Sequence, residues 1–418
     1  MGSSQPTVVI AGAGVVGLAT AALLATGRCA DRLRVHVLDA RAPPPWRSEE
    51  LDLRVYALSR ASQRLLESVG AWWSIAARRA CAYRRMHVWE GADPADGALE
   101  FDSADIAEPD LGHIVEDSLI RAALADVLAA APNAEVTPGA AVESLETERR
   151  AAVVRLAGGR TLRGTLLVAA DGSDSAVRRL LALPVAARSY DQTALVTHVA
   201  SAKSHRETAW QRFLPGGPLA FLPLADGRSS VVWSLPSERA AELLAVVPDA
   251  LVAELTSASA GVLGDIESCG ARAGFPLQAL HAPRYCAPRA ALVGDAAHTV
   301  HPLAGQGMNL GLLDAAALAR VVEDALLAGE DPGDLKVLRR YERERKGANL
   351  EMLLALDALH RLFALPDWAA PLRGAGLRTV QRSGVAKRFF MRRALGLNAG
   401  SKNRLRWSHA LGRSSPRQ

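Results

Sequence analysis

The glycine-rich segment near the start of this 418-residue sequence has the spacing of a dinucleotide-binding turn. Gly12, Gly14 and Gly17 lie between a predicted strand and a predicted helix, and Asp39 ends the next predicted strand. The first glycine permits a tight turn, the second lets backbone amides approach a pyrophosphate, and the third lets the helix pack closely on the strand. A carboxylate at the position of Asp39 can bind a ribose hydroxyl. The segment predicts dinucleotide binding, but it does not distinguish NAD from FAD.

Two later segments also place carboxylates where predicted strands end. Asp171 follows one strand, with Arg178 a few residues behind it, and Gly294-Asp295 end another. A carboxylate at such a position can bind a polyol chain. Beyond it, Pro302 begins a loop that opens a long helix, and a glycine-rich helix N-terminus can stabilise negative charge on a flat ring. This loop and the start of its helix contain Gly305, Gln306, Gly307 and Asn309.

The elements that must position these residues follow from hydrophobic periodicity and from glycine and proline breaks. We expect strands over 7–12, 34–39 and 290–294, and a hairpin of 151–156 with 160–169 closed by Gly158-Gly159. Alternating polar and apolar residues predict an antiparallel sheet over 190–235. Helices are expected from the first glycine turn to about 25, and over 59–69, 113–131, 308–328 and 341–365.

With all three motifs in this order, the sequence resembles the FAD-dependent aromatic hydroxylases of the para-hydroxybenzoate hydroxylase type. The motifs are GxGxxG, the Asp171-Gly172 pair and GDAAHxxxPxxGQGxN. Within that family it looks most like the ubiquinone-biosynthesis hydroxylases, because residues 211–233 resemble their substrate-domain strands. Arg54, with Ala57-Leu58-Ser59 after it, resembles the arginine segment that meets FAD.

The resemblance implies a role for each matching residue. Gly12, Gly14 and Gly17 would receive the pyrophosphate and Asp39 the adenosine ribose. Further cofactor-binding positions would be Arg54 at the phosphates, and Asp171 and Arg178 supporting FAD and the approach of the reductant. Asp295 would bind the ribityl chain or the pyrophosphate region, and Gly294 and Pro302 would also belong to the cofactor site. The flavin ring would be lined by Gly305, Gln306, Gly307 and Asn309. No side-chain base is assigned, and Asp117 lies where relatives often carry Asn or Gln.

The resemblance also implies an α/β fold, with a Rossmann-like FAD-binding domain, an inserted antiparallel-sheet substrate domain and a helical C-terminus. The FAD-binding domain would comprise residues 1–75, 101–185 and 276–335. The substrate domain would comprise 76–100 and 186–275, and a basic helical region 336–418 would follow.

The activity implied is hydroxylation of a lipophilic phenol, a polyprenylated intermediate of ubiquinone biosynthesis. FAD would activate O2 as a C4a-hydroperoxide, and NAD(P)H or an electron-transfer protein would supply electrons, since there is no second GxGxxG. Two alternatives remain open: a hydroxylase of a soluble phenolic or polyketide metabolite, and a flavin-binding component of a biosynthetic complex without turnover.

Charge is distributed unevenly along the chain, whose formal net charge is +5. No acidic residue follows Asp367, whereas twelve of the 49 basic residues do. Residues 384–397 mix basic pairs with aromatic side chains, which favours an interfacial helix. We therefore expect attachment to an anionic membrane surface or to accessory biosynthetic proteins, and no binding of nucleic acid. The expected location is cytoplasmic, with peripheral attachment at the inner face of the membrane as one form of it. The alternative for residues 384–397 is a surface helix that is docked on the FAD-binding domain and has a solvated basic side.

Several other residues have competing interpretations. The uncharged run 7–27 has the length of a membrane span, but the glycine spacing explains it better. No metal site is expected, because His298 and His301 lack a third ligand, and Asp314 is expected to bond the backbone or the motif loop. Phe213, Phe221 and Trp233 suit either a ring-binding pocket or the core of a sheet. The four separated cysteines fit a reducing compartment.

Overall fold

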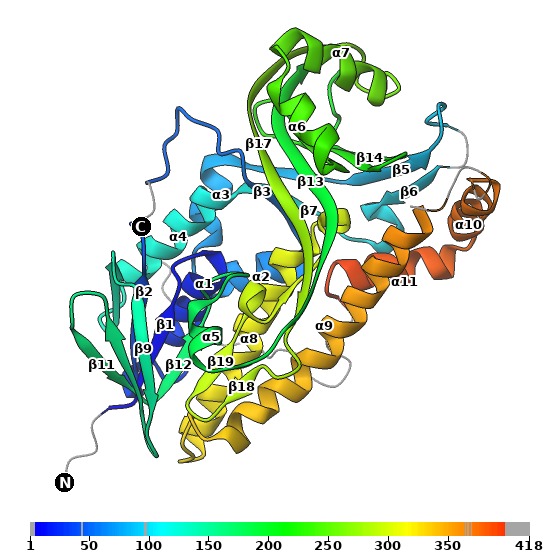
Figure 1. Ribbon diagram of the computed structural model, residues 1–418. Helices are drawn as coiled ribbons and strands as arrows, with labels where there is room; N and C mark the ends of the chain where they lie inside the picture. Colours follow the sequence, from blue (N-terminus) through cyan, green and yellow to red (C-terminus); the bar gives the residue numbers. More distant parts are fainter. Residues whose placement is uncertain are drawn as a thin grey trace, which may run out of the picture.

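The computed structural model describes residues 5–42, 45–95, 98–363, 365, 368 and 370–397. Its lower half in Figure 1 is built on a six-stranded sheet in the order β18-β19-β12-β1-β2-β8. All neighbours are parallel except β18 and β19. The strands are β1 (Thr7–Ala11), β2 (Arg34–Asp39), β8 (Ala134–Pro138), β12 (Leu166–Ala169), β18 (Cys286–Ala287) and β19 (Ala290–Leu292).

Apolar sequence on both faces explains why this sheet is buried. Val8, Val9 and Ile10 of β1 are all almost fully inaccessible, and they share one core with the helices and with a small sheet. The helices that form this half of the molecule are α1 (Val15–Thr26), α2 (Arg60–Ser68), α3 (Trp72–Arg79), α4 (Asp117–Ala129), α5 (Ala176–Leu180) and α8 (Gln306–Leu327). The small sheet is β9 (Val142–Thr147), β10 (Ala152–Leu156) and β11 (Thr161–Gly164).

The upper half is an eight-stranded sheet in the order β20-β17-β13-β16-β15-β14-β5-β6. Its two longest strands run down beside α8 and α9 in Figure 1 and so connect the two halves. The strands are β5 (Arg85–Glu90), β6 (Leu99–Asp102), β13 (Ala186–Ser201), β14 (Thr208–Leu214), β15 (Gly217–Pro223), β16 (Ser229–Pro236), β17 (Ile266–His281) and β20 (His298–Thr299).

One face of this sheet packs under α6 (Ser237–Ala245) and α7 (Pro248–Ala258). Phe221 and Trp233 belong to that core, so the core interpretation holds for both. Phe213 lies on the opposite face, where its ring stacks on Phe363 with 3.5 Å between centroids.

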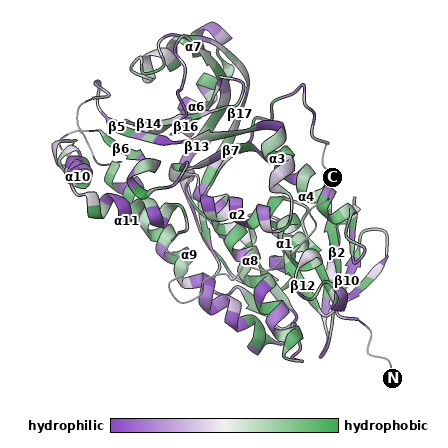
Figure 2. Cartoon of the chain, turned by 180° about the vertical axis from the view of Figure 1, so that it is seen from behind, coloured by the Kyte–Doolittle hydropathy of each residue, from purple (hydrophilic) through white to green (hydrophobic). Residues whose placement is uncertain are grey.

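A third, three-stranded sheet lies between the halves, in the order β3-β7-β4. It consists of β3 (Val55–Leu58), β4 (Ala80–Tyr83) and β7 (Gly112–Glu116). The C-terminal helices then run along one side of the molecule as α9 (Leu335–Phe363), α10 (Ala370–Arg382) and α11 (Gly384–Ala394). In Figure 2 these helices carry hydrophilic and hydrophobic residues together.

Three expectations about local structure are corrected. The helix expected from residue 113 begins at Asp117, because 113–116 pair as β7 with β3 and β4. The second hairpin strand, 160–169, is divided: β11 pairs with β10, whereas β12 enters the large parallel sheet beside β1. Strand β17 continues to His281, past residue 275, because its lower end pairs with β13 and β20.

Candidate functional site

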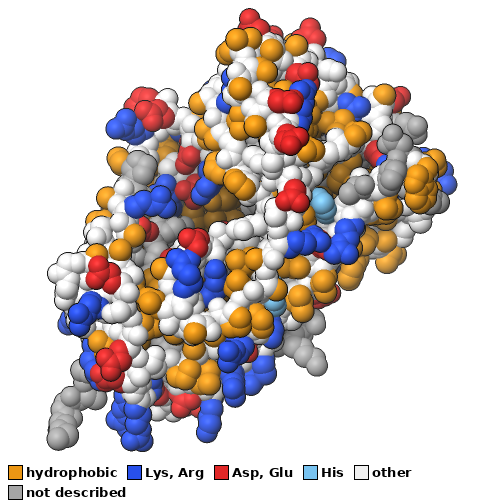
Figure 3. Space-filling model, viewed as in Figure 1, with side chains coloured by type: hydrophobic (Ala, Val, Ile, Leu, Met, Phe, Trp, Pro, Cys, Tyr) orange, Lys and Arg blue, Asp and Glu red, His pale blue; other side chains and the backbone are white. Residues whose placement is uncertain are grey.

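A cavity of about 940 Å³ lies between the two halves of the molecule. Figure 3 shows it as a hollow with hydrophobic side chains inside and charged side chains around its mouth. The elements that line it come from the six-stranded sheet, the β3 sheet and the eight-stranded sheet. The cavity is therefore continuous from the glycine-rich turn after β1 to the inner face of the upper sheet.

At one end of the cavity, Asp39 fixes the turn between β1 and α1. Its carboxylate accepts hydrogen bonds from the backbone N–H groups of Ala13 at 2.7 Å and Arg41 at 2.8 Å. A Cβ on Gly12 would come within 2.2 Å of the Ala170 carbonyl oxygen, so the glycine is required for this close approach. A Cβ on Gly14, in contrast, would meet nothing within 4 Å, because that residue faces the cavity.

Two helices begin at the cavity with no side chain capping their first turns. Gly14 is the N-cap of α1 and Gly305 that of α8, and neither helix has a side-chain cap. Both glycines line the cavity. Uncapped N-terminal N–H groups and the helix dipole favour bound negative charge. The arrangement fits a ligand with a pyrophosphate at one place and an electron-accepting ring at another, as in FAD.

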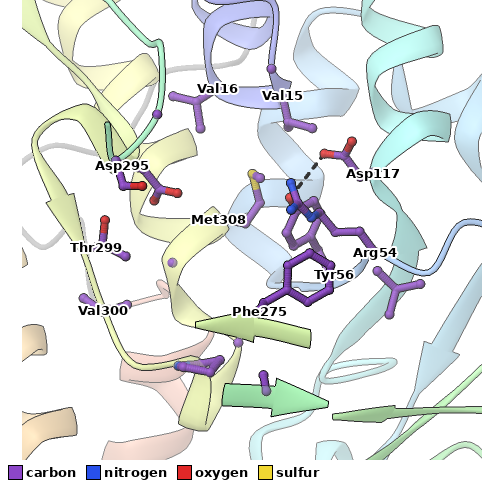
Figure 4. Close-up of a pocket in the computed structure, with 18 of the residues that line it drawn as sticks. Val15, Val16, Arg54, Tyr56, Asp117, Phe275, Asp295, Thr299, Val300 and Met308 are labelled. Atoms are coloured by element: carbon purple, nitrogen blue, oxygen red, sulfur yellow. Dashed lines mark hydrogen bonds between the residues drawn. The ribbon is translucent and has the colours of Figure 1, made fainter. Parts of the chain in front are cut away.

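Figure 4 shows the middle of the cavity, where Arg54, Tyr56 and Asp117 gather on one side and Asp295 lies opposite. The Tyr56 hydroxyl donates to Asp117 at 3.2 Å, and the guanidinium of Arg54 lies 5.2 Å from the centroid of the Phe275 ring. Burial raises the pKa of the Asp295 carboxyl, while His298 and Arg54 act in the opposite direction. A polar ligand chain between the two sides would therefore meet a cation and hydrogen-bonding groups.

Asp171 and Arg178 have different positions. Asp171 lines the cavity, and its carboxylate accepts hydrogen bonds from Ser175 and from the backbone of Val177. Arg178 is buried and is not part of the cavity wall: its guanidinium donates to the carbonyl oxygens of Ala296 at 2.9 Å and Ser173 at 2.7 Å. Arg178 thus connects the loop after β12 to the turn after β19.

The expected ring loop is also divided by the structure. Pro302, Gly305 and Gly307 line the cavity, whereas Gln306 and Asn309 are buried outside its wall. Asn309 accepts hydrogen bonds from Ser59 and Ser62 and donates to the carbonyl oxygens of Ala57 and Gly305. It therefore holds α8 against the end of β3 and the start of α2.

A buried ionic network lies directly behind the cavity. Asp314 of α8 accepts hydrogen bonds from Gly294 at 3.2 Å and from Arg345 of α9 at 2.7 Å, and it pairs with His298. Burial opposes its ionisation, but His298 and Arg345 outweigh burial and lower the pKa of this carboxyl to about 2. The expectation that Asp314 bonds the motif loop is confirmed by its contact with Gly294.

Sequence reasoning missed two members of this network, Arg345 and Asn349. Asn349 donates to Asp314 at 3.0 Å and accepts from Arg345 at 2.8 Å. Their spacing of four residues puts them on one face of α9, but that spacing is common on solvated helix faces.

His301 caps the turn before α8, because its Nδ1 accepts a hydrogen bond from the backbone N–H of Leu303. Among the described residues, no group of three or more His, Cys, Asp or Glu is placed to hold a metal.

The other end of the cavity is the inner face of the eight-stranded sheet. On β16, Ser230, Val232 and Ser234 line the cavity, whereas the residues between them face α6 and α7. Gln211 lines it from β14. A smaller cavity of about 160 Å³ adjoins this end, and the two share Pro218 and Leu303 in their walls.

Comparisons with known proteins agree with this geometry. A family model described as FAD binding domain matches residues 5–353. Among curated relatives, 3-demethoxyubiquinol 3-hydroxylase of Escherichia coli is 36% identical over 94% of this chain and 100% of its own length. Ubiquinone hydroxylase UbiL of Rhodospirillum rubrum is 37% identical over 93% of this chain and 89% of its own.

Solved structures match the whole architecture. A probable FAD-dependent monooxygenase from Pseudomonas aeruginosa superposes with a TM-score of 0.73 at 26% identity, covering 90% of this chain and 100% of the other. The p-nitrophenol 4-monooxygenase of Pseudomonas putida DLL-E4 has a TM-score of 0.75 at 20% identity, covering 93% and 98%. The second likeness concerns the fold alone.

Proposed function

This chain belongs to the FAD binding domain family, and from that premise we propose that it hydroxylates the aromatic ring of a polyprenylated phenol or quinol in ubiquinone biosynthesis. The observation that carries the proposal is the single cavity of about 940 Å³. The glycine-rich turn after β1, the uncapped N-terminus of α8 and an apolar sheet face all border this one continuous space. The relatives named as ubiquinone hydroxylases support the substrate class.

Residues of this chain would hold FAD along the cavity. The turn from Gly12 to Gly17 would receive the pyrophosphate, with Asp39 at the ribose and Asp295 at the ribityl chain. The N-terminus of α8, from Gly305 to Gly307, would stabilise negative charge on the reduced ring. Bound FAD supplies the two-electron activation of O2. The sheet above would orient the phenol and exclude water.

The reductant is proposed to be NAD(P)H or an electron-transfer protein. Asp171 borders the cavity and Arg178 fixes its loop, so this loop would support the flavin where a reductant approaches. Oxidation of NADH and NADPH by the purified holoenzyme, measured with and without a prenylated phenol, distinguishes the two sources. Substrate-stimulated oxidation supports a nicotinamide, and its absence supports a protein donor.

A membrane surface is proposed as the place where α11 binds. Val385 is 75% and Phe389 53% exposed on this helix, next to the exposed Arg388 and Arg392. Exposed apolar side chains beside cations are typical of an interfacial helix. Met391 and Leu395 on its other face are buried against the body of the protein. The last five basic residues, from Lys402 onward, lie outside the described residues.

No helix among the described residues combines the length and hydrophobicity needed to cross a bilayer. The run 7–27 instead forms β1 and the buried helix α1. Attachment through α11 would therefore bring the enzyme to a lipid-dissolved substrate without insertion of a span.

The decisive experiment is quinone profiling in a strain that lacks this gene. Accumulation of a prenylphenol that lacks one hydroxyl is the expected result, and the missing hydroxyl identifies the carbon. Plasmid-borne wild-type gene restores the quinone. An unchanged quinone pool in a strain with no second enzyme for the step contradicts the proposal and favours a soluble phenolic substrate.

A further inference from the structure

The inner face of the eight-stranded sheet is almost entirely apolar where it meets the cavity. Alternate residues of neighbouring strands present small or branched side chains, namely Ala194, Val196, Ala220, Leu222, Val232 and Leu277. Five polar side chains from strands of this sheet also line the cavity: Gln211, Ser230, Ser234, Gln278 and Thr299. An apolar pocket with a few polar groups is the usual design of a small-molecule site, in which the polar groups fix orientation.

Gln211 is buried, whereas Gln278 is exposed, and the Gln211 amide has no partner in the part of the chain that the structure describes. It is 6% exposed and lines the cavity, and among the described residues no hydrogen-bond partner is found for its side-chain amide. Its cross-strand neighbours are Ala220 on β15 and Val88 on β5, which offer no polar side chain. The Ser230 hydroxyl is likewise buried without a partner. Buried polar groups are normally hydrogen-bonded, so an unpartnered amide that lines a cavity indicates a polar atom on the ligand.

His198 of β13 lies on the inner sheet face opposite Ser230, but it does not line the cavity: its Nε2 pairs with the Asp52 carbonyl oxygen at 3.0 Å, and burial lowers its pKa, which keeps it neutral near pH 7. The carboxylates of the cavity wall come from the end of β2, the start of α4 and the loops after β12 and β19: Asp39, Asp117, Asp171, Asp174 and Asp295. Tyr83 also lines the cavity, and burial raises its pKa, which keeps it protonated. The ring end of the substrate therefore meets neutral donors and acceptors.

We propose that Gln211 binds an oxygen substituent of the substrate ring and positions the ring as a neutral phenol or quinol, without removing its proton. This inference rests on the proposed function, which does not specify the side chain that binds the substrate ring. The amide oxygen accepts from a ring hydroxyl, and the amide nitrogen donates to a ring oxygen. Because a neutral amide cannot take a proton, a suitable ring is one already made electron-rich by its oxygen substituents.

Gln211→Leu tests the contact, because leucine keeps the volume and removes both hydrogen-bonding atoms. The holoenzyme should retain its FAD content and its melting temperature. The Kd for a phenol carrying one prenyl group, followed by the change in flavin absorbance, should rise about tenfold, the effect of one lost hydrogen bond. Hydroxylated product per O2 consumed should fall, with hydrogen peroxide rising in its place. Gln381→Leu, on the outer helix α10, is the matched control and should match wild type.

The protonation state of the bound ring has a test that does not depend on turnover. A phenolate absorbs at longer wavelength than its phenol, so the difference spectrum on binding to oxidised enzyme reports ionisation directly. We expect no phenolate band at pH 8 in wild type, and an unchanged spectrum in Gln211→Leu. Appearance of that band, or wild-type affinity and coupling in Gln211→Leu, overturns the inference. A wild-type enzyme that hydroxylates no prenylated phenol instead contradicts the proposed function.

Discussion

Gly14 and Gly17 are three residues apart in one turn, yet a side chain would have opposite consequences at the two positions. Gly14 has a φ of −70° and open space where its Cβ would point, so the protein alone tolerates a larger residue there. A Cβ on Gly17 would lie 2.0 Å from the Gly12 carbonyl oxygen, which is incompatible with the packing of α1 on β1.

Gly14→Val should therefore abolish FAD retention while leaving the melting temperature of the apoprotein within a few degrees of wild type. The added methyl groups fill the space that the pyrophosphate needs. Gly17→Val should lose both flavin and folded protein, measured by absorbance and circular dichroism. Gly347→Ala, in α9, serves as control because its Cβ meets nothing. Normal flavin content in Gly14→Val would contradict the assignment of the turn.

At residue scale the sequence predicted the wall of the nucleotide end well. The spacing of the glycines and of Asp39 is visible in the sequence, and Gly12, Gly14 and Asp39 are found in the cavity wall, although Gly12 is required by the approach of Ala170, far away in sequence. Asn309 and Arg178 instead stabilise the loops from behind. Motif spacing cannot separate these two roles, because a residue that touches the ligand and a residue that holds its loop occupy the same segment.

At the scale of elements, Asp314 connects the turn after β19, helix α8 and helix α9. Asp314→Asn leaves Arg345 buried with no ionic partner, so we expect a loss of about 3–5 kcal/mol in the free energy of unfolding. Asp324→Asn, at an exposed ion pair of the same helix, should cost under about 1 kcal/mol. Denaturant unfolding at pH 7 measures both, and equal losses would contradict the central role of Asp314.

The pKa of Asp314 adds a pH dependence with a definite sign. Its folded value of about 2 lies below the unfolded value of about 3.9. Its stabilising contribution is present above pH 4 and is lost as the pH falls toward 2. Wild type should therefore lose stability steeply across that window, and Asp314→Asn should show a shallower slope there.

Helix α11 gives the second prediction at this scale. Replacing Val385 and Phe389 together by serine should reduce binding to phosphatidylglycerol vesicles about a hundredfold or more, since each buried apolar side chain contributes about 1.5–3 kcal/mol. Flavin content should not change. Val247→Ser removes a similarly exposed apolar residue beside α7 and should bind vesicles normally. Equal vesicle binding by all three proteins would contradict the membrane proposal.

The elements that sequence patterns mispredicted are those defined by distant partners. Residues 113–116 have helical periodicity but are a strand, since β3 and β4 both pair with them. The antiparallel sheet predicted over 190–235 is confirmed by β13 to β16, whereas β5, from a distant part of the chain, joins this sheet parallel to β14. Strand pairing depends on packing and neighbours far away in sequence, so local propensity is a weak guide to it.

On the scale of the whole molecule, the convergence of the motifs is predictable because the carboxyl ends of parallel strands meet at one edge of a sheet. Which side of the upper sheet faces the cavity cannot be predicted from the sequence, because a shift of the strand pairing by one residue exchanges the two faces.

The basic side chains of the C-terminal region are also less available to an outside partner than the composition indicates. Arg373 and Lys387 pair with Glu90 and Asp105 on the body of the protein, and Arg393 pairs with Glu351 of α9.

The position of Arg345 has a consequence for synthesis of the chain. Strand β1 is synthesised first, but it pairs with β12. The turn that carries Asp295 is held by Asp314, and Asp314 in turn accepts a hydrogen bond from Arg345, which is synthesised much later. The flavin pocket therefore cannot be completed until α9 has left the ribosome. Nascent chains arrested so that only residues 1–334 emerge should capture no FAD, whereas released full-length chains should, as measured by flavin fluorescence. Cofactor loading is then a late event, and retained flavin reports that a chain was synthesised through α9.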